Sequence, residues 1–586
     1  MAQGLNNKII KRVSCVVALG LLAGCASVGG STGRDYAPLP FQDEGGISAG
    51  VSPTLPGEYL AGRQALRDKD TQAASDFLSA AYSLNKQDNL LLQSAFRAAL
   101  ANGEAAKTRK LAAEIIARDG IDDDMAQLVL AIDDIKATQF SNASQRIEKI
   151  KARGFNILLK PVLLAWAQVG EGKFDLAVKT LDDLDKYDGF KLLKPYHLAL
   201  LAHASGQTEL AREQYEKALK GPAGRAIRLV QSYGIFLLEQ GEPDKARQLF
   251  TDYKKRFPLS PTINRLLEQL DDGESIKPLI ANPVEGAAEA LYSSASIIGQ
   301  ERAKSAAITF ANFALMLRPD LTVANVLLAE IYEGRGQRQK ALEYYLKIPR
   351  SSPYSLNARI RVAWLTYKLG DEDTAIRSLE KLTEENPAEV EPLIILADLN
   401  RDRKDWKSAA AAYGRAIDTI GDVKGRIWSL LYARGIAYER MGQWEKAEAD
   451  FLRALDIQPN HPQILNYLGY SWADRGEKLE QAKQLLIKAV SLRPRDGYIV
   501  DSLGWLYYRV KDYKNATVQL ERAVALQPED PTINDHLGDV YWQVGRQNEA
   551  RYQWQRALWL EPEADQIPLI ERKLQEGLAV GNGSAK

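Results

Sequence analysis

Residues 531–562 read PTINDHLGDVYWQVGRQNEARYQWQRALWLEP, and this stretch decides the fold. Apolar and small side chains recur every three to four residues on both sides of Gly545, a spacing that predicts two amphipathic helices joined by a tight turn. Pro562 stands after the second helix, where a proline ends the helix because it lacks the backbone N–H. The stretch is therefore expected to fold as a helical hairpin.

The hairpin pattern returns every 34 residues towards the N-terminus, with one extra residue in the unit that starts at Pro462. The units that start at Trp428, Pro462, Gly497 and Pro531 each carry a glycine at position 8 and a proline after the second helix. Less regular units in the same phase start near Val390, Leu356, Thr322 and Ala288. Eight units in one phase, over residues 288–562, predict a well-formed repeat array.

The repeated residues are of the kinds that close packing of two helices requires. A glycine at position 8 and an alanine at position 20 let the helices of a hairpin approach, and aromatic side chains at positions 11 and 24 fill the remaining space. The glycines concerned are Gly435, Gly469, Gly504 and Gly538. These positions are expected to be structural.

The N-terminal half carries the same pattern in a degraded form, over residues 55–270. Clearer units centre on Ala165, Ala199 and Gly234, and weaker units begin near residues 55, 89 and 123. Residues 271–287 break the phase and are expected to form a joint between two superhelical segments. After the array, residues 563–578 are expected to form the capping helix that a terminal repeat requires, and residues 579–586 a flexible tail.

The residue pattern resembles the signature of the tetratricopeptide repeat family, Leu-Gly-x-x-Tyr followed by Ala-x-x-x-Phe and Pro. Leu537, Gly538, Tyr541, Ala550 and Pro562 stand at these places in the last repeat. The resemblance implies an all-α fold, namely an α-solenoid superhelix of about 14 helical hairpins.

The N-terminus has the anatomy of a bacterial lipoprotein signal. Three basic residues lie within residues 8–12, and a short apolar run follows at residues 13–23. The sequence LAGC at 22–25 resembles the lipobox, which implies a signal peptide at residues 1–24 and acylation of Cys25. Ala26 after the cysteine favours the outer membrane. A signal peptide without lipidation, or a chance apolar run, is the alternative.

Residues 25–54 are rich in glycine, serine and proline and are expected to form a disordered tether to the membrane. Within them, Gly46 to Gly50 formally matches the elbow motif of serine hydrolases. That motif needs a strand before it and a helix after it, and neither is expected here. Ser48 is therefore not expected to be catalytic.

Composition and motifs speak against several other functions. Lys plus Arg and Asp plus Glu each number 76, so no strong field would attract nucleic acid. Both cysteines, Cys15 and Cys25, lie at the N-terminus, and the sequence motifs of zinc proteases, P-loops and Cys-x-x-Cys sites are absent. The four histidines, His197, His203, His461 and His536, are expected to be surface or packing residues. No enzyme activity, metal or cofactor is expected.

The family resemblance places a partner in the concave groove, against positions 2, 5, 9, 12 and 13 of each first helix. In the last four repeats these positions include Tyr432, Asn466, Tyr470, Tyr498, Asp501, Trp505, Tyr508, Arg509, Asp535, Asp539 and Trp542. Aromatic residues at positions 9 and 12 are expected to be exposed for binding, because the packing of their own hairpin does not need them. The alternative is that the next repeat covers them.

Together these features predict a lipid-anchored scaffold that faces the periplasm and gathers proteins for envelope assembly, secretion or cell-wall machinery. The alternative is a glycan-binding module of an export system. In that case Tyr470, Trp505, Tyr508 and Trp542 would stack on sugar rings, and Asp501 and Asp539 would bind hydroxyl groups.

Overall fold

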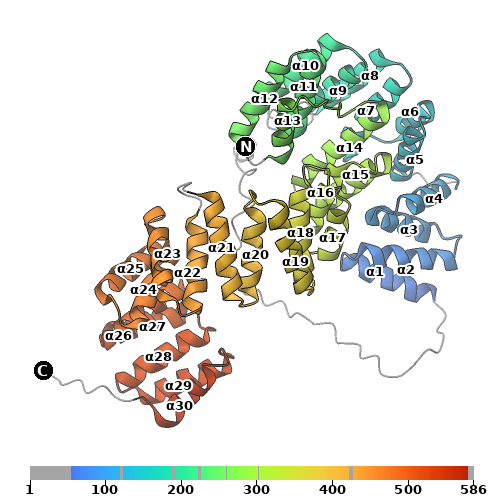
Figure 1. The fold of residues 1–586 in the computed structure, drawn as a ribbon. Coiled ribbons are helices and arrows are strands. Elements are labelled where there is room, and N and C mark those ends of the chain that lie inside the picture. The colour runs from blue at the N-terminus through green and yellow to red at the C-terminus, as the bar shows by residue number, and fades with distance from the viewer. Residues whose placement is uncertain are drawn as a thin grey trace, which may run out of the picture. The chain divides into compact units, whose positions relative to one another are not determined.

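The computed structural model describes residues 54–118, 123–187, 193–221, 226–258, 260–300, 303–421 and 427–578. The predicted signal peptide, Cys25, Ser48 and the predicted tail lie outside these ranges. All regular structure within the described residues is helical, with 30 α-helices and one 3-10 helix (Figure 1). Of these, 28 α-helices form fourteen consecutive pairs, while α13 and α30 stand alone. The prediction of an all-α solenoid of about 14 hairpins is confirmed.

The chain divides into two compact units between Arg359 and Ile360. The first unit contains α1 (Leu55–Arg67), α2 (Thr71–Leu84), α3 (Asn89–Asn102), α4 (Ala105–Ile116), α5 (Asp124–Lys136), α6 (Phe140–Lys149), α7 (Asn156–Gly170), α8 (Phe174–Leu181), η1 (Asp182–Lys186), α9 (Lys194–Ala204), α10 (Thr208–Lys220), α11 (Ile227–Glu239), α12 (Pro243–Arg256), α13 (Pro261–Asp271), α14 (Pro283–Gln300), α15 (Lys304–Leu317), α16 (Thr322–Glu333) and α17 (Arg338–Leu346).

Helix α18 (Ser355–Lys368) crosses the boundary between the units. The second unit continues with α19 (Glu372–Glu385), α20 (Glu391–Asp402), α21 (Trp406–Ile420), α22 (Trp428–Arg440), α23 (Trp444–Ile457), α24 (Pro462–Arg475), α25 (Leu479–Leu492), α26 (Gly497–Arg509), α27 (Tyr513–Leu526), α28 (Pro531–Gln543), α29 (Gln547–Trp559) and α30 (Ile567–Glu576).

The repeat phase read from the sequence gives the helix starts directly. The last four first helices begin at Trp428, Pro462, Gly497 and Pro531, the residues at which the repeats were expected to start. Asp496 and Asp530 cap two of these helices, because their carboxylates accept the N–H groups of Ile499 and Ile533. Sequence alone therefore sets both the phase and the N-terminal boundaries of these hairpins.

The position-8 glycines pack as expected. A Cβ atom placed on Gly504 would come within 2.6 Å of Leu520 Cγ, and one on Gly538 within 2.5 Å of the Trp554 ring. Leu520 and Trp554 are both fully buried on the second helix of the same hairpin. The two helices can lie this close only because position 8 has no side chain.

A non-helical segment, residues 272–282, separates α13 from α14 in the first unit. After it the chain turns back, so that α14 packs on α7, α9 and α5, and α15 packs on α5 and α3 (Figure 1). The break in the helices lies within the expected joint at 271–287. The boundary of the compact units lies elsewhere, because α14 and α15 pack on the N-terminal helices and α16 packs on α14 and α15.

Helix α30 occupies the place of the first helix of a further hairpin, packed on α29. Ile570 is buried against α28 and α29, while Glu571, Arg572 and Gln575 on its outer side are exposed. A polar outer face is what a terminal repeat needs in water. None of the described helices has both the length and the apolar character that a membrane crossing requires.

Candidate functional site

The predicted groove residues lie on the first helices of the last four hairpins, α22, α24, α26 and α28. Eight are at least partly exposed: Tyr432, Asn466, Tyr470, Tyr498, Trp505, Tyr508, Arg509 and Asp535. The other three, Asp501, Asp539 and Trp542, are buried, with exposed fractions of 6%, 4% and 6%. The structure thus divides the predicted set into an accessible part and a covered part.

Trp542 was expected to be exposed, and this expectation is wrong. Its indole Nε1 donates a hydrogen bond to the Leu578 carbonyl at 2.6 Å. Gly577, with φ +72°, passes so close that a Cβ atom there would lie 2.0 Å from the ring. The chain after α30 therefore covers Trp542. This outcome corresponds to the alternative stated above, in which the element after the repeat covers the aromatic residue at position 12.

Asp535 and Asp539 are also engaged within the chain. Lys573 of α30 donates hydrogen bonds to Asp535 at 2.7 Å and to Asp539 at 2.9 Å, and Trp554 Nε1 donates to Asp539 at 2.9 Å. Burial and the neighbouring Asp535 raise the pKa of Asp539 to about 6, against the opposing effect of Lys573. These two carboxylates bind the capping helix through Lys573 and are not available to a ligand.

Asp501 pairs with a residue that sequence reasoning did not place in the groove. His536 on α28 is buried and lies 3.0 Å from Asp501 through Nδ1. Burial alone would lower the pKa of His536, but Asp501 beside it raises that pKa above its ordinary value. The Trp505 ring stacks on the His536 ring at 4.1 Å and on the Tyr508 ring at 4.8 Å. The Asp501–His536 pair joins two neighbouring repeats, and the His536 ring sets the position of Trp505.

The accessible residues form what we call the aromatic face, made of Tyr470, Tyr498, Trp505 and Tyr508. Tyr498 is the most open, with 53% of its surface exposed. The other three are half-buried. Burial raises the pKa of Tyr470, with Asp474 and Asp501 adding to the effect, so its hydroxyl stays neutral and can donate.

Charged groups of both signs lie at the edge of the aromatic face. Asp474 accepts a hydrogen bond from Trp505 Nε1 at 3.2 Å and lies 3.7 Å from the guanidinium of Arg509. Arg509 is exposed, so its remaining donors face solvent. The face thus offers rings for apolar contact beside one carboxylate and one guanidinium, the mixture that protein-binding surfaces use.

Two residues of this region were missed, His536 and Lys573. Both pair with acidic residues at position 5 of the preceding first helix, His536 with Asp501 and Lys573 with Asp535. An acidic residue at position 5 of two successive repeats was the available signal. These acidic residues could have been interpreted as needing a basic side chain from the following helix, rather than as binding a partner.

The other histidines agree with the structural interpretation. His197 is fully buried, His203 contacts Tyr215 and Glu239, and His461 packs against the Trp428 ring at 4.4 Å. Among the described residues no cluster of His, Cys, Asp and Glu is arranged to hold a metal ion.

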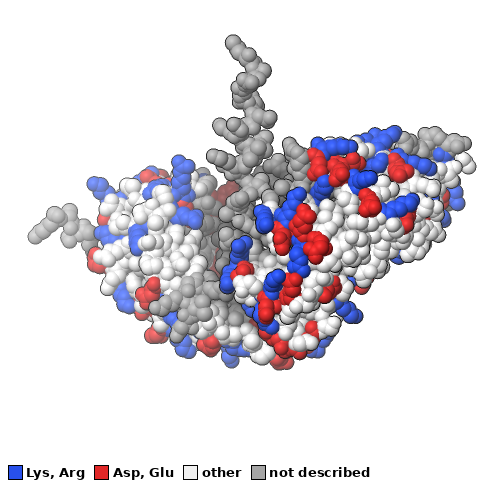
Figure 2. Space-filling model, turned by 90° about the horizontal axis from the view of Figure 1, so that it is seen from above, with Lys and Arg blue, Asp and Glu red and all other residues white. Residues whose placement is uncertain are grey.

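Surface charge on the face drawn in Figure 2 does not point to a second site. Figure 2 shows basic and acidic side chains intermixed over the face that it draws, rather than gathered by sign. Such a surface gives no long-range attraction for a polyanion.

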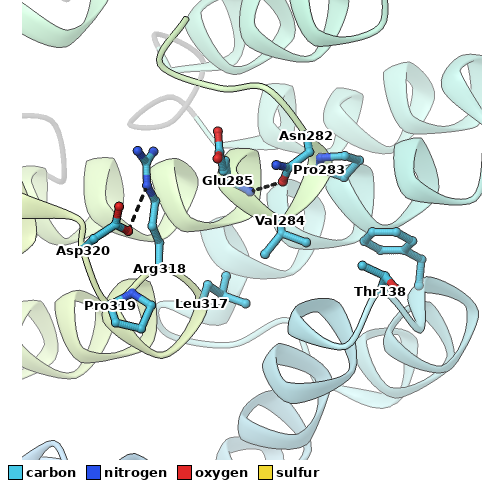
Figure 3. A pocket seen from close by; sticks show the side chains of 10 residues that line it. Thr138, Asn282, Pro283, Val284, Glu285, Leu317, Arg318, Pro319 and Asp320 are labelled. Atoms are coloured by element: carbon cyan, nitrogen blue, oxygen red, sulfur yellow. Dashed lines mark hydrogen bonds and ion pairs between the residues drawn. The ribbon is translucent and has the colours of Figure 1, made fainter. Parts of the chain in front are cut away.

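A cavity of about 430 Å³ lies in the first unit, beside the N-terminus of α14 (Figure 3). It is lined by Thr138, Phe140, Asn282, Pro283, Val284, Glu285, Leu317, Arg318, Pro319 and Asp320. Its charged groups have partners in the chain, since Arg318 lies 3.4 Å from Asp320 and donates to the Leu279 carbonyl at 3.2 Å. This is an apolar hollow with no catalytic arrangement among its lining residues.

Two family models match the chain, and both are described as tetratricopeptide repeat. One covers residues 428–461, and the other covers residues 196–261 and 363–422. The matched residues fall in both the degraded half and the regular half of the array.

Curated relatives match over part of their length. The TPR repeat-containing protein PA4667 of Pseudomonas aeruginosa is 27% identical over 191 residues, which is 32% of this chain and 31% of the relative. The general transcriptional corepressor ssn6 of Schizosaccharomyces pombe is 28% identical over 138 residues, 23% of this chain and 12% of the relative. The matches thus span a third or less of these relatives. Among solved structures, a tetratricopeptide repeat protein from Parabacteroides merdae is similar with a TM-score of 0.36 and 15% identity, over 43% of this chain and 97% of that chain.

Proposed function

Because the chain contains tetratricopeptide repeats, we propose that it is a protein-binding scaffold of the bacterial cell envelope and that the aromatic face is a partner site. The observation that carries the site is the stack of half-buried Trp505 and Tyr508, with Tyr498, 53% exposed, two turns earlier on the same helix α26. Aromatic rings that the hairpin does not need, held rigid by stacking, are the usual anchors of a protein interface.

The partner that suits this face is a peptide or a protein segment. Stacking and the hydrogen bond to Asp474 hold Trp505 in one orientation, so little side-chain freedom is lost when a partner binds. Exposed Arg509 can pair with a carboxylate of the partner. A segment with apolar side chains and an acidic residue satisfies both features.

Glycan binding has less support. Of the residues that would serve it, Asp501, Asp539 and Trp542 are buried and engaged with His536, Lys573 and Leu578. Sugar hydroxyls would have to displace contacts that the fold itself uses. A peptide needs none of these three residues.

The envelope location is supported by the sequence of the N-terminus. The basic residues, the apolar run and the LAGC sequence at 22–25 together favour export and acylation of Cys25. Acyl chains on that cysteine would anchor the repeats at a membrane, and a second chain makes such anchoring stable. Periplasmic exposure and a role in envelope assembly, secretion or cell-wall machinery belong to the same proposal.

The test begins with a photo-crosslinking amino acid at Tyr498 in living cells, followed by mass spectrometry and purification of the captured protein. Affinity is then measured for the wild-type chain and for Trp505→Ala. Loss of an aromatic anchor is expected to weaken binding by about 2 kcal/mol, or about 30-fold. Trp559→Ala is the matched control, because Trp559 is 79% exposed on the second helix α29, away from the groove positions.

A thermal melt accompanies each variant. Unchanged affinity in a Trp505→Ala chain that melts like the wild type would remove the partner site from this face. Equal losses in Trp505→Ala and Trp559→Ala would also contradict the proposal, because binding would then not depend on the aromatic face.

A further inference from the structure

The first unit holds one of its own hairpins against its N-terminal repeats. Helices α14 and α15 pack on α3, α5, α7 and α9, as Figure 1 also shows. All four are first helices of their hairpins, the helices that line the groove in an array of this kind. We call these four helices the N-terminal inner face. A groove that could receive a partner is therefore filled by the chain itself.

A buried ion pair fixes the inserted hairpin. Glu289 of α14 is 2% exposed and accepts hydrogen bonds from both Nε and Nη2 of Arg228, the first at 2.9 Å. Tyr196 Oη donates to the same carboxylate at 3.3 Å. Burial alone would lower the pKa of Arg228, but Glu289 raises it, so the guanidinium stays charged. Arg228, on the following first helix α11, and Tyr196, on α9 of the inner face, thus form a receptor for one carboxylate.

The fit around this carboxylate is specific. Gly286 lies one turn before Glu289, and a Cβ atom there would come within 2.3 Å of the Trp166 ring. Phe310 of α15 meets Phe155 edge to face, with ring centroids 5.8 Å apart. Only a helix with a small residue three positions before an acidic one can lie this close to Trp166 while it reaches Arg228.

The same contact region also leaves polar groups without partners. Trp166 Nε1, both ring nitrogens of His197 and Asn312 Nδ2 are buried and make no hydrogen bond within the described part of the protein. A buried polar group without a hydrogen-bond partner destabilises the packed state, and it regains hydrogen bonds when water reaches it. Contact between the hairpin and the inner face is therefore specific but weaker than a fully satisfied core.

The chain also has the length that release would need. Residues 272–282 are non-helical, and residues 272–275 are exposed. Eleven extended residues can span roughly 36–40 Å. On its N-terminal side the hairpin can thus leave the inner face while it remains tethered to α13. On its C-terminal side only residues 318–321 separate α15 from α16, so α16 moves with the hairpin.

From these observations we propose that the α14–α15 hairpin is a releasable internal ligand of the N-terminal inner face, and that this face binds a second class of partner. That partner is an amphipathic helix with a small residue three positions before a glutamate, the pattern of Gly286 and Glu289. It competes with the hairpin for Arg228, Tyr196 and Trp166. This site is separate from the aromatic face and does not depend on it.

The first test uses the full chain and a fluorescent peptide with the sequence of residues 283–300. Glu289→Ala weakens the internal ligand but leaves its receptor intact. The peptide is expected to bind the Glu289→Ala chain at least about tenfold more tightly than the wild type, because the internal ligand occupies the wild-type face. An Arg228→Ala, Glu289→Ala chain should lose this gain, and so should a peptide in which the glutamate is alanine.

Failure of the peptide to bind a folded Glu289→Ala chain would overturn the proposal. If that chain does not fold, a second measurement decides with Glu289 in place. Ala290, 1% exposed and one turn after Gly286, is changed to Cys in a chain carrying Cys15→Ser and Cys25→Ser. Ala516→Cys in the α26–α27 hairpin, at 0% exposure, is the control. The thiol at 290 is expected to react with a thiol reagent at least about tenfold faster than the thiol at 516. Equal rates would show that the hairpin does not leave the inner face.

Discussion

Gly504 shows what the repeat requires of one residue. Leu520 Cγ lies 2.6 Å from the place a Cβ atom would take, so a side chain at position 504 must push the two helices apart. Gly504→Leu is expected to lower the free energy of unfolding by about 1–3 kcal/mol or more. Urea unfolding measures the loss, and hydrogen exchange over residues 462–560 should show it first in the neighbouring repeats.

Gly414 provides the matched control for this change. A Cβ atom there would meet nothing closer than Arg434 Nη1 at 3.5 Å, an ordinary contact. Gly414→Ala in the interior of α21 is expected to stabilise the chain by up to about 1 kcal/mol, because alanine favours the helix. A Gly504 variant as stable as the Gly414 variant would refute the assignment of position 8.

His197 is expected to make the first unit sensitive to acid. Burial lowers its pKa to about 4, against an unfolded value near 6.5. Between these values the unfolded chain binds a proton that the folded chain excludes. The contribution of His197 to stability is therefore complete above about pH 6.5 and falls as the pH drops towards 4, by up to about 3 kcal/mol.

The variant His197→Leu tests this dependence. It removes both the titration and two buried nitrogens that have no hydrogen-bond partner within the described residues. Its stability at pH 7.5 is expected to equal or exceed that of the wild type. Chemical unfolding at pH 7.5, 6 and 4.5 compares the two chains. A difference that stays constant across these pH values would show that His197 titrates normally.

Residues whose environment is set within one hairpin could be predicted from the sequence, and residues covered by the next element could not. Gly504 and Gly538 face their own second helix, so the repeat pattern alone identifies them. Burial of Asp501 depends on His536, and burial of Trp542 depends on Gly577 and Leu578. A repeat signature describes how one hairpin packs, but not which polar partners the next helix brings.

At the scale of the element, the capping helix α30 depends on one side chain. Lys573 neutralises Asp535 and Asp539, and without it the buried Asp539 would keep a like-charged neighbour and lose the lysine that bonds to it. Lys573→Ala is expected to destabilise the last hairpin by about 3 kcal/mol. Arg572→Ala, at the exposed position next to it, is the control and should change stability by less than about 0.5 kcal/mol.

Hydrogen exchange of α28 to α30 is the measurement for both variants. Faster exchange confined to these helices in the Lys573 variant is the expected result, because each repeat packs mainly on its neighbours. Equal behaviour of the two variants would mean that the two aspartates do not need the lysine.

Helix positions followed from the sequence, whereas the packing of α14 and α15 did not. Local periodicity and the position of Pro462 or Pro531 are enough to start a helix. The contact of Phe310 with Phe155 joins residues 155 positions apart, and no local pattern records it. The sequence showed the interruption at 271–287. It did not show that the next hairpin returns onto α7 after this interruption.

At the scale of the whole molecule, the proposed lipid anchor at Cys25 can be tested with one substitution. Cys25→Ser is expected to abolish acylation and to move the protein from the membrane fraction to the soluble fraction, because the proposed acyl anchor is then lost. Cell fractionation and metabolic labelling with palmitate measure the two effects. Cys15→Ser is the control and should leave both unchanged. Persistent labelling of the Cys25 variant would refute the lipobox interpretation.

The return of α14 and α15 onto the N-terminal helices also bears on the order of folding. Among the described side-chain hydrogen bonds of the second unit, the one with the greatest sequence separation joins Lys573 and Asp535, which are 38 residues apart. Folding of this unit can therefore spread from one repeat to the next. In the first unit the Gln337 side chain donates to the Lys69 carbonyl across 268 residues. Closing such long loops is slow, and chains with many distant contacts fold slowly. The first unit, although synthesised first, is therefore expected to reach its final packing after the second, and its inner face stays open on the ribosome until residue 317 has emerged.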